Sequence, residues 1–487
     1  MKLKKLIKDI EGIEVKGPKE IEISGVCSHS KCVSPGNLFI ARNGNAYKGT
    51  DFIDEAINSG ANAILTDLYD PAYKEVAQIL CKDIRRVEAE LAAAYYGHPS
   101  KQMSVVGITG TSGKTTVSYL VKHLLERLGS PSGLIGSIEY RIGDICYPAT
   151  HTTPDVVKVH KLLKEMLDNK LKSAVMEVTS HALDQERVKG VHFDTAIFTN
   201  LSHDHLDYHR NMDEYAQAKE KLFHMLRLSD GKMKTAIVNA DDSWSARMML
   251  RYSGDSLTYG IQNHADVRAV SITTEEGHIH FQAVFRGMNY PASFPLSGRF
   301  NIYNCLAALA VGLSKGFSLQ ECIEALNNPP IIPGRLERLE NDHGIYVFVD
   351  HAHKPGALET VLKSFMEIKK RSVITVFGCG GDRDPYKRPL MAACAEMYSD
   401  KVIVTNDNPR SEDPQAIIAA IVKGFKTNKY VVEPDRKKAI ELALKTAKKD
   451  DIVLLAGKGH ETYQIFAHRT LPFSDRLVAQ NFLETLA

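Results

Sequence analysis

The sequence predicts an α/β protein with three domains, and three observations support that fold class. The chain has 487 residues, which is too long for a single core. Apolar strand-like stretches alternate with helix-period segments, the pattern of a parallel sheet covered by helices. Gly- and Pro-containing breaks occur near residues 95–100 and 328–335. We therefore predict an N-terminal α/β domain at 1–100, a central P-loop mononucleotide-binding parallel-sheet domain at 101–333, and a C-terminal Rossmann-like domain at 334–487.

Composition excludes several classes of protein. Hydrophobic residues make up 44% of the chain and charged residues 25%, as in ordinary globular proteins. The net charge of +2 gives no reason to expect nucleic acid or an anionic membrane as a partner. The eight cysteines form no Cys-x-x-Cys pair, and no apolar run approaches the roughly 18 residues of a membrane span. The start of the chain lacks a secretory apolar core. We expect a cytoplasmic, monomeric protein with reduced thiols that does not insert into membranes.

In the predicted N-terminal domain, the first block of the sequence, short apolar stretches predict strands at 21–26 and 38–41 and a helix at 52–58. In the central domain, the second block, strands are predicted at 173–178, 195–199 and 234–239. In the C-terminal domain, the third block, they are predicted at 346–350, 373–378, 401–405 and 451–456. Ligands of open α/β sheets gather at the carboxyl ends of strands. In the third block this rule indicates Asp350 and the segments 378–384, 407–410 and 457–461.

Residues 107–116 (GITGTSGKTT) follow an apolar stretch and precede a helix-like one. Such a strand, glycine-rich turn and helix presents backbone N–H groups to phosphate at a helix N-terminus. Lys114 can reach terminal phosphates, and the hydroxyl of Thr115 can contact a phosphate-bound Mg²⁺. The strict P-loop pattern requires glycine where Ile108 stands, so the loop is a variant. It predicts binding of a nucleoside triphosphate.

Four motifs together resemble one family. They are the loop at 107–116, residues 176–183 (MEVTSHAL), residues 199–209 (TNLSHDHLDYH) and residues 407–410 (DNPR). In this order and spacing they look like the Mur ligases, three-domain ATP-dependent enzymes that join amino acids to a UDP-linked muramoyl precursor of the bacterial cell wall. The chain is most similar to the branch that adds the third residue. The resemblance implies addition of meso-2,6-diaminopimelate to UDP-N-acetylmuramoyl-L-alanyl-D-glutamate through an acyl phosphate.

The resemblance also implies the nucleotide and metal residues. ATP would be bound by Gly110, Thr111, Ser112, Gly113, Lys114, Thr115, Thr116, Asn301 with its neighbour Asn304, Arg335 and Asp350. Two Mg²⁺ ions would be held by Thr115, Glu177, His205 and a carbamylated Lys219. Lys114, Lys219 and His205 would be the catalytic residues. His203, His205 and His209 could instead suggest zinc, but no fourth ligand is spaced nearby and phosphate oxygens favour Mg²⁺.

Substrate contacts follow from the same resemblance. The UDP-linked dipeptide would meet Ser28, Ser30, Asn45, Thr152, Thr153, Thr179, Gln185 and Arg187. In the first block, His29 and Lys31 depart from the Asp and Arg that the family has on either side of Ser30. Diaminopimelate would meet Arg383, Asp407, Asn408, Pro409, Arg410, Gly457 and Glu461.

The acceptor residues also carry a physical argument. Diaminopimelate differs from lysine by one carboxylate, and arginine presents paired donors that fit a planar carboxylate. Arg410 supplies that fork, Arg383 suits the other end of the molecule, and Glu461 suits an ammonium. A lysine substrate would leave the arginine charge uncompensated. We therefore predict a preference for meso-diaminopimelate over lysine.

Three alternatives remain open from the sequence. One is the lysine-adding form of the same ligase, which Arg410 disfavours. Another is a folylpolyglutamate-type ligase, which shares the phosphate loop but would lack a UDP-binding first block and the segment at 407–410. The third is an ATPase that couples hydrolysis to conformational change and needs no amino-acid pocket. Phosphate release that depends on both acceptor substrates would separate them.

Overall fold

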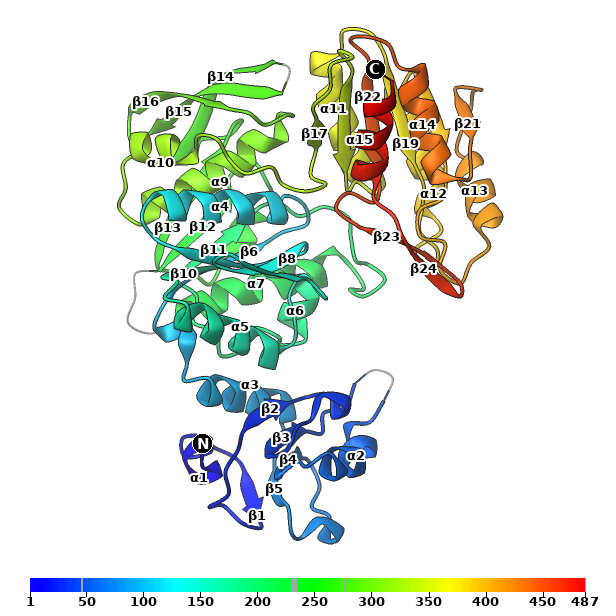
Figure 1. Cartoon of the computed structure of the whole chain (residues 1–487). Helices are drawn as coiled ribbons and strands as arrows, with labels where there is room; N and C mark the ends of the chain where they lie inside the picture. Colours follow the sequence, from blue (N-terminus) through cyan, green and yellow to red (C-terminus); the bar gives the residue numbers. More distant parts are fainter. Residues whose placement is uncertain (45–46, 229–233, 276, 487) are drawn as a thin grey trace. The chain divides into compact units, whose positions relative to one another are not determined.

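The computed structural model describes residues 1–44, 47–228, 234–275 and 277–486. The chain divides into two compact units, Met1–Thr258 and Tyr259–Ala487. Figure 1 labels the helices and strands of the chain. In the described part of the chain, no helix has the length and apolar character that crossing a membrane requires.

The N-terminal part of the first unit is a five-stranded sheet in the order β1-β5-β4-β3-β2. Strand β1 is antiparallel to β5, and the other pairs are parallel. Buried side chains of helix α3 pack against this sheet. The elements are α1 (Leu3–Leu6), β1 (Glu14–Lys16), β2 (Gly25–Cys27), β3 (Asn37–Ile40), α2 (Ile53–Asn58), β4 (Ala63–Thr66), β5 (Ala77–Leu80) and α3 (Ile84–Tyr95).

The strand predicted at 21–26 is wrong for most of its length. Only its last two residues belong to β2, and Glu22 forms an isolated bridge with Lys2. The backbone groups of Ile21 and Ile23 instead bond to Leu3 and Met1 at the chain's start. These partners lie about 20 residues away, so an apolar pattern alone could not reveal them. The helix predicted at 52–58 is confirmed as α2.

The rest of the first unit is built around parallel strands in the order β12-β11-β6-β10-β7, continued by the antiparallel β8 and β9. The strands at 173–178, 195–199 and 234–239 are confirmed within one or two residues. Every residue of β10, β11 and β12 is buried, as expected for a sheet covered on both faces. The elements are β6 (Ser104–Thr109), α4 (Lys114–Arg127), β7 (Ser132–Ile135), β8 (Glu139–Ile142), β9 (Ile145–Pro148), α5 (Val156–Asp168), β10 (Ser173–Glu177), α6 (Ser180–Asp184), β11 (Thr195–Phe198), α7 (Met212–Leu228), β12 (Thr235–Asn239) and α8 (Ser245–Met249).

The second unit begins with strands that the parallel-sheet prediction did not include. Strand β13 (Asp255–Gly260), which spans the boundary of the units, runs parallel to β14 (Val267–Glu275) at its end. Strand β14 pairs antiparallel with β15 (His278–Phe285), and β15 with β16 (Met288–Phe294). Helices α9 (Phe300–Ser314) and α10 (Leu319–Leu326) follow, and α9 is apolar almost throughout.

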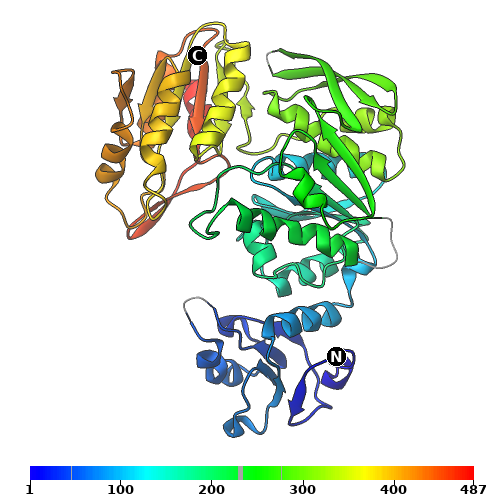
Figure 2. The ribbon, with the colours of Figure 1, turned by 180° about the vertical axis from the view of Figure 1, so that it is seen from behind.

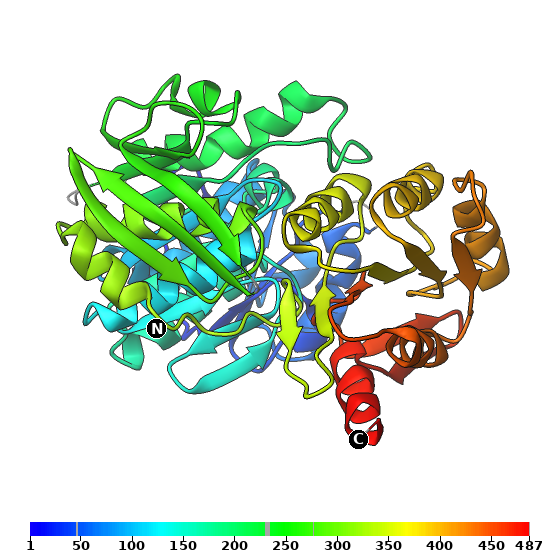
Figure 3. The same ribbon diagram turned by 90° about the horizontal axis from the view of Figure 1, so that it is seen from above.

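The C-terminal part of the second unit is a six-stranded sheet in the order β17-β18-β22-β19-β20-β21, parallel except for β17. Figure 2 shows α11, α12 and α13 in front of one face of it, and Figure 3 shows α14 and α15 on the other face. All four predicted strands are confirmed. The elements are β17 (Glu337–Leu339), β18 (Tyr346–Asp350), α11 (Pro355–Ile368), β19 (Val373–Phe377), α12 (Lys387–Tyr398), β20 (Lys401–Val404), α13 (Pro414–Val422), β21 (Tyr430–Val432), α14 (Arg436–Thr446), β22 (Ile452–Ala456), the hairpin β23 (Tyr463–Phe466) and β24 (Arg469–Pro472), and α15 (Asp475–Thr485).

Candidate active site

The glycine-rich loop lies between β6 and α4, as the sequence predicted. Gly110 and Gly113 have φ of 146° and 85°, a region that favours glycine. A Cβ on Gly110 would lie 1.9 Å from Oγ1 of Thr199. Residues after β11 hold the loop: Asn200 accepts bonds from the backbone N–H groups of Thr111 and Ser112, and Thr199 donates to the Ser112 carbonyl at 2.7 Å. Hydrogen bonds from the segment after β11 therefore hold this loop at a helix N-terminus.

Two lysines converge on this loop. Lys114 and Lys219 donate from Nζ to the Gly110 carbonyl, at 3.0 and 2.8 Å. Lys219 is only 1% exposed and lies 4.5 Å from the ring centre of Tyr215. The hydroxyls of Tyr215 and Thr111 are 3.1 Å apart. The helix lysine predicted to act in catalysis is thus buried at the phosphate loop rather than solvated.

Glu177 is fully buried at the end of β10. Its carboxylate accepts bonds from the Thr115 hydroxyl at 3.0 Å and from the backbone N–H and hydroxyl of Ser137 at 2.8 and 3.0 Å. No positively charged side chain pairs with it in the residues that the structure describes. A buried carboxylate beside a hydroxyl is a hard oxygen donor set, the kind that suits Mg²⁺. Thr115 and Glu177 therefore lie together as predicted.

The three histidines of the segment after β11 differ in their exposure to solvent. His205 has a positive φ of 53°, a half-exposed side chain and Asp204 at 3.3 Å. Its ring centre lies 6.0 Å from that of Tyr215, which places it on the same side of α7 as Lys219. His209 is buried and His203 is exposed. Among the described residues no group of three or more His, Cys, Asp or Glu side chains is arranged to hold a metal by itself.

The residues predicted for the dipeptide form a second group that adjoins Glu177. The hydroxyl of Thr152 lies 3.0 Å from that of Ser137, and Thr153 donates to the Glu177 carbonyl at 2.8 Å. Arg187 donates to the Thr153 carbonyl at 3.0 Å. It also donates from Nε and Nη2 to the side chain of Gln185. Thr179 caps α6 and bonds to Thr153 through its backbone N–H.

Sequence reasoning missed a second arginine near this group. Burial lowers the pKa of Arg187, and the positive charge of Arg42 lowers it further. Arg42 pairs with Glu88 of α3 at 3.0 Å, and Glu88 is fully buried. Two positive charges that act on each other favour a negatively charged ligand nearby. Of the predicted uridine residues, Ser30 is buried in a 3-10 turn and Ser28 is half-buried. Asn45 lies outside the described residues.

In the second unit, Asp350 ends β18 and is buried. It accepts bonds from the backbone N–H groups of Leu336 and Ala352 at 2.6 and 2.8 Å. Burial raises its pKa, and the nearby charge of Arg335 opposes that shift. Three histidines lie alongside: the ring centre of His351 is 4.6 Å from that of His353 and 5.3 Å from that of His460.

The asparagines predicted to contact ATP are buried near the start of α9. Asn304 donates to the Asn301 side chain at 2.7 Å, and Asn301 donates to the Ser297 carbonyl at 2.7 Å. Their amide groups are therefore held in one orientation. Their role in binding ATP stays a prediction.

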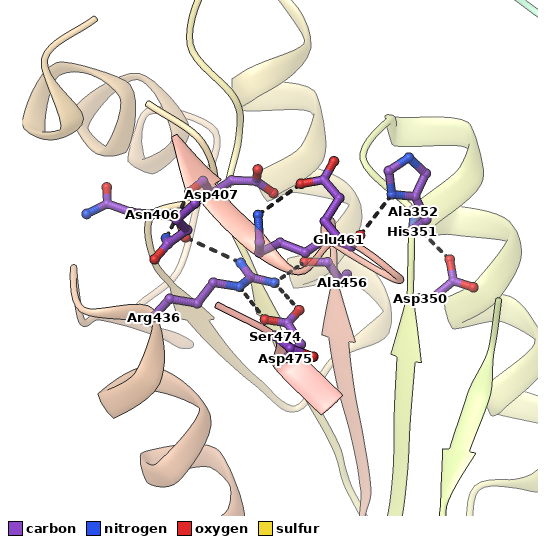
Figure 4. A network of polar contacts seen from close by, with 12 residues as sticks. Asp350, His351, Ala352, Asn406, Asp407, Arg436, Ala456, Glu461, Ser474 and Asp475 are labelled. Carbon is purple, nitrogen blue, oxygen red and sulfur yellow. Dashed lines mark hydrogen bonds and ion pairs between the residues drawn. The ribbon is translucent and has the colours of Figure 1, made fainter. Parts of the chain in front are cut away.

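The residues predicted for the incoming amino acid converge at the carboxyl ends of β20 and β22. Asn408 donates to Oε2 of Glu461 at 2.8 Å, and the buried Nζ of Lys458 donates to the same oxygen at 2.9 Å and to Asn408 at 3.1 Å. A Cβ on Gly457 would lie 2.7 Å from Asp407. The close-up in Figure 4 shows Asp407 and Glu461 at this end of the sheet. Lys458 was not predicted, although it lies within the Gly-Lys-Gly-His-Glu segment.

Both predicted arginines come close to one glycine. A Cβ on Gly380 would lie 2.8 Å from Nη1 of Arg410 and 3.9 Å from Cγ of Arg383. Arg410 has φ of 53° and donates to the Gly381 carbonyl at 2.7 Å, while its backbone bonds to Ile465 of the β23–β24 hairpin. Such backbone strain in a residue with a large side chain is found at functional sites.

Comparison with known proteins identifies the family. The description "Mur ligase middle domain" matches residues 108–312, "Mur ligase, glutamate ligase domain" matches 334–459, and "Mur ligase family, catalytic domain" matches 22–96. Together these matches cover most of the chain. The chain belongs to the Mur ligase family.

Relatives of this Mur ligase match it from end to end. Proteins called UDP-N-acetylmuramoyl-L-alanyl-D-glutamate–2,6-diaminopimelate ligase are 41% identical in Caldanaerobacter subterraneus, over 99% of both chains, and 42% identical in Chlamydia caviae, over 100% of both. A solved structure with the same name covers 100% of this chain and 99% of its own, with a TM-score of 0.72 and 29% identity. The MurF ligase of Thermotoga maritima in complex with ADP shares the fold, at a TM-score of 0.66 and 20% identity over 95% and 98% of the two chains.

Proposed function

We propose that this Mur ligase joins meso-2,6-diaminopimelate to UDP-N-acetylmuramoyl-L-alanyl-D-glutamate while ATP is converted to ADP and phosphate. The observation that carries the proposal is the acceptor site of the second unit, where Asn408, Glu461 and two arginines meet at the carboxyl ends of parallel strands. The names of the full-length relatives support the same reaction. ATP and a UDP-linked sugar are nucleotides of the cytoplasm, where we propose that a monomer acts.

The chemistry starts from a carboxylate, which does not react with an amine because its leaving group is too poor. A carboxylate oxygen of the dipeptide attacks the γ-phosphorus of ATP, so that ADP leaves and an acyl phosphate forms. The amine of diaminopimelate then attacks the carbonyl carbon, phosphate leaves and the amine loses a proton. Positioning and charge neutralisation supply most of the catalysis.

In the first unit, the loop from Gly110 to Thr116 would bind the triphosphate of ATP. Lys114 now lies on the Gly110 carbonyl, and we expect its ammonium to turn to the phosphates, which are the stronger acceptors. The γ-phosphorus would then lie near Glu177 and near the residues predicted to bind the dipeptide. The loop residues would bind and orient the triphosphate, and Lys114 would neutralise part of its charge.

Two Mg²⁺ ions, held by Thr115, Glu177, His205 and carbamylated Lys219, would neutralise phosphate charge when bound. The oxygen donors of Thr115 and Glu177 fit such ions. Lys219 as an ammonium bonds to a carbonyl oxygen, whereas its carbamate would be repelled by that oxygen. We therefore expect carbamylation to move the Lys219 side chain away from Gly110. Mass spectrometry of the intact protein with and without CO₂ tests this modification.

The UDP-linked dipeptide would occupy the group formed by Thr152, Thr153, Thr179, Gln185 and Arg187. Arg187 presents a fork that suits a carboxylate or a phosphate. Because Arg42 adds a second positive charge nearby, we include it among the residues that attract this anionic substrate. Ser28, Ser30 and Asn45 would contact the uridine diphosphate.

For the acceptor, Arg410 and Arg383 would bind the carboxylates of diaminopimelate. Glu461, with Asn408, Asp407, Pro409 and Gly457, would fix an ammonium end. Oε2 of Glu461 already accepts bonds from Lys458 and Asn408, so the ammonium would meet Oε1. A lysine substrate lacks one carboxylate and would leave one guanidinium unpaired.

Phosphate release by the purified protein tests the proposal. We expect release only when ATP, Mg²⁺, the UDP-linked dipeptide and diaminopimelate are all present, with a tripeptide product of the expected mass. Equal activity with lysine would contradict the choice of acceptor. Equal ATP hydrolysis without either acceptor substrate would contradict the ligase function altogether.

A further inference from the structure

A buried ion pair lies behind the acceptor site and is not part of the proposed chemistry. Arg436, the first residue of α14, and Asp475, the first residue of α15, both have fully buried side chains. Arg436 donates from Nε and Nη2 to the two carboxylate oxygens of Asp475, at 2.7 and 2.6 Å. This is a two-pronged pair, the strongest geometry that an arginine and a carboxylate form.

The same guanidinium bonds to the backbone of two strand ends. Nη2 donates to the carbonyl of Ala456 at 2.9 Å, and Nη1 lies 3.4 Å from the carbonyl of Asn406 (Figure 4). Ala456 directly precedes Gly457, and Asn406 directly precedes Asp407. One side chain thus bonds to the residues that directly precede both segments of the acceptor site.

Asn406 has a second link to the start of α14. Its side chain donates to the Pro434 carbonyl at 2.8 Å, two residues before Arg436. The charge of Arg436 also acts on the site, because Asp475, Asp407 and Glu461 together keep its pKa above the ordinary value despite burial, which lowers it. Arg436 is therefore coupled to acceptor residues both through the backbone and through charge.

We propose that Arg436, held by Asp475, is a positioning residue that fixes the segments 407–410 and 457–461 relative to each other for binding of the diamino acid. Arg436 does not reach the substrate in this role. It acts through the carbonyls of Ala456 and Asn406. The inference rests on the proposed function for its kinetic test, but its structural test does not.

The test must separate positioning from stability. Removing one partner of a buried pair would leave an uncompensated charge and could unfold the unit, whereas replacing both by apolar residues of similar size is often neutral or stabilising. The main variant is therefore Arg436→Met together with Asp475→Leu. Arg436→Lys keeps the charge but loses the fork that reaches both carbonyls. Leu444→Ala, in the core on the same helix, is the control for lost stability.

For the double variant we expect a Tm close to that of the wild type and kcat/KM for diaminopimelate lowered about 10–100-fold, the range for a misplacement near 1 Å. KM values for ATP and the UDP-linked dipeptide should change less than twofold, by the same reasoning. Arg436→Lys should behave similarly but more mildly. Leu444→Ala should lower the Tm without this selective effect on the acceptor.

Hydrogen exchange provides the second readout and needs no substrate. The backbone N–H groups of Asp407, Asn408, Arg410 and 457–461 should exchange faster in the folded double variant and not in Leu444→Ala. A folded double variant with unchanged exchange and unchanged acceptor kinetics would overturn the inference. A wild-type protein inactive with diaminopimelate would refute the proposed function, and the exchange data would still decide the role of Arg436.

Discussion

Glu88 makes the stability of the first unit depend on pH, and Glu88→Gln should reveal it. Glu88 is buried on α3, one carboxylate oxygen pairs with Arg42 at 3.0 Å, and the other has no hydrogen-bond partner among the described residues. Burial raises the pKa of Glu88 from 4.5 to about 7, against the opposing charge of Arg42. The folded protein therefore holds a proton that the unfolded chain releases.

The sign follows from this order of pKa values. Because the pKa is higher in the folded state, the wild type loses stability as the pH rises from about 4.5 to about 7, and the loss is complete above pH 7. A pKa raised to that extent corresponds to about 3 kcal/mol. About 2.5 kcal/mol of it should develop between pH 5 and pH 8. Glutamine does not titrate and should not show this loss.

Thermal unfolding of both proteins at pH 5 and pH 8 measures the effect. At each pH, the Tm of the wild type is subtracted from the Tm of the variant, and the two differences are compared. A cost of the new amide that does not depend on pH cancels in this comparison. At about 2–4 °C per kcal/mol, the variant should gain about 5–10 °C relative to the wild type on going from pH 5 to pH 8. Glu90→Gln, at a partly buried position on the same helix where the carboxylate pairs with Arg86, serves as the control. A Tm difference that stays constant with pH would refute the reasoning.

Other predictions concern the two sites. Glu177→Gln should lower kcat/KM about 100-fold and raise the Mg²⁺ concentration needed for half-maximal rate, because a buried anion beside Thr115 is lost; an unchanged Mg²⁺ titration would contradict this. Arg410→Ala should lower kcat/KM for diaminopimelate about 100-fold and leave the KM for ATP unchanged, because a charge-assisted pair with the acceptor is lost. Steady-state kinetics with each substrate varied measure both values, and an unchanged kcat/KM for diaminopimelate would contradict this role. Gly381→Ala places a Cβ 1.9 Å from the Pro409 carbonyl and should cost about 1–3 kcal/mol and weaken acceptor binding. Gly356→Ala, where a Cβ meets nothing within 4 Å, should be neutral by both measurements.

Local patterns in the sequence predicted the elements that carry the chemistry. The glycine-rich loop, the strands of the third block and the polar segments at their carboxyl ends are all recognisable from spacing alone. The strand at 21–26 and the antiparallel strands β14 to β16 were not, because their hydrogen-bond partners determine them more than their own composition does.

The sequence by itself determined which residue types stand at strand ends and helix starts, since those depend on neighbours a few positions away. Only the tertiary structure decided that Lys219 lies on the Gly110 carbonyl, that Arg42 acts on Arg187, and that Arg436 joins two strand ends. Each of these relations connects residues far apart along the chain. Their geometry depends on how sheets and helices pack, and no periodicity in the sequence encodes it.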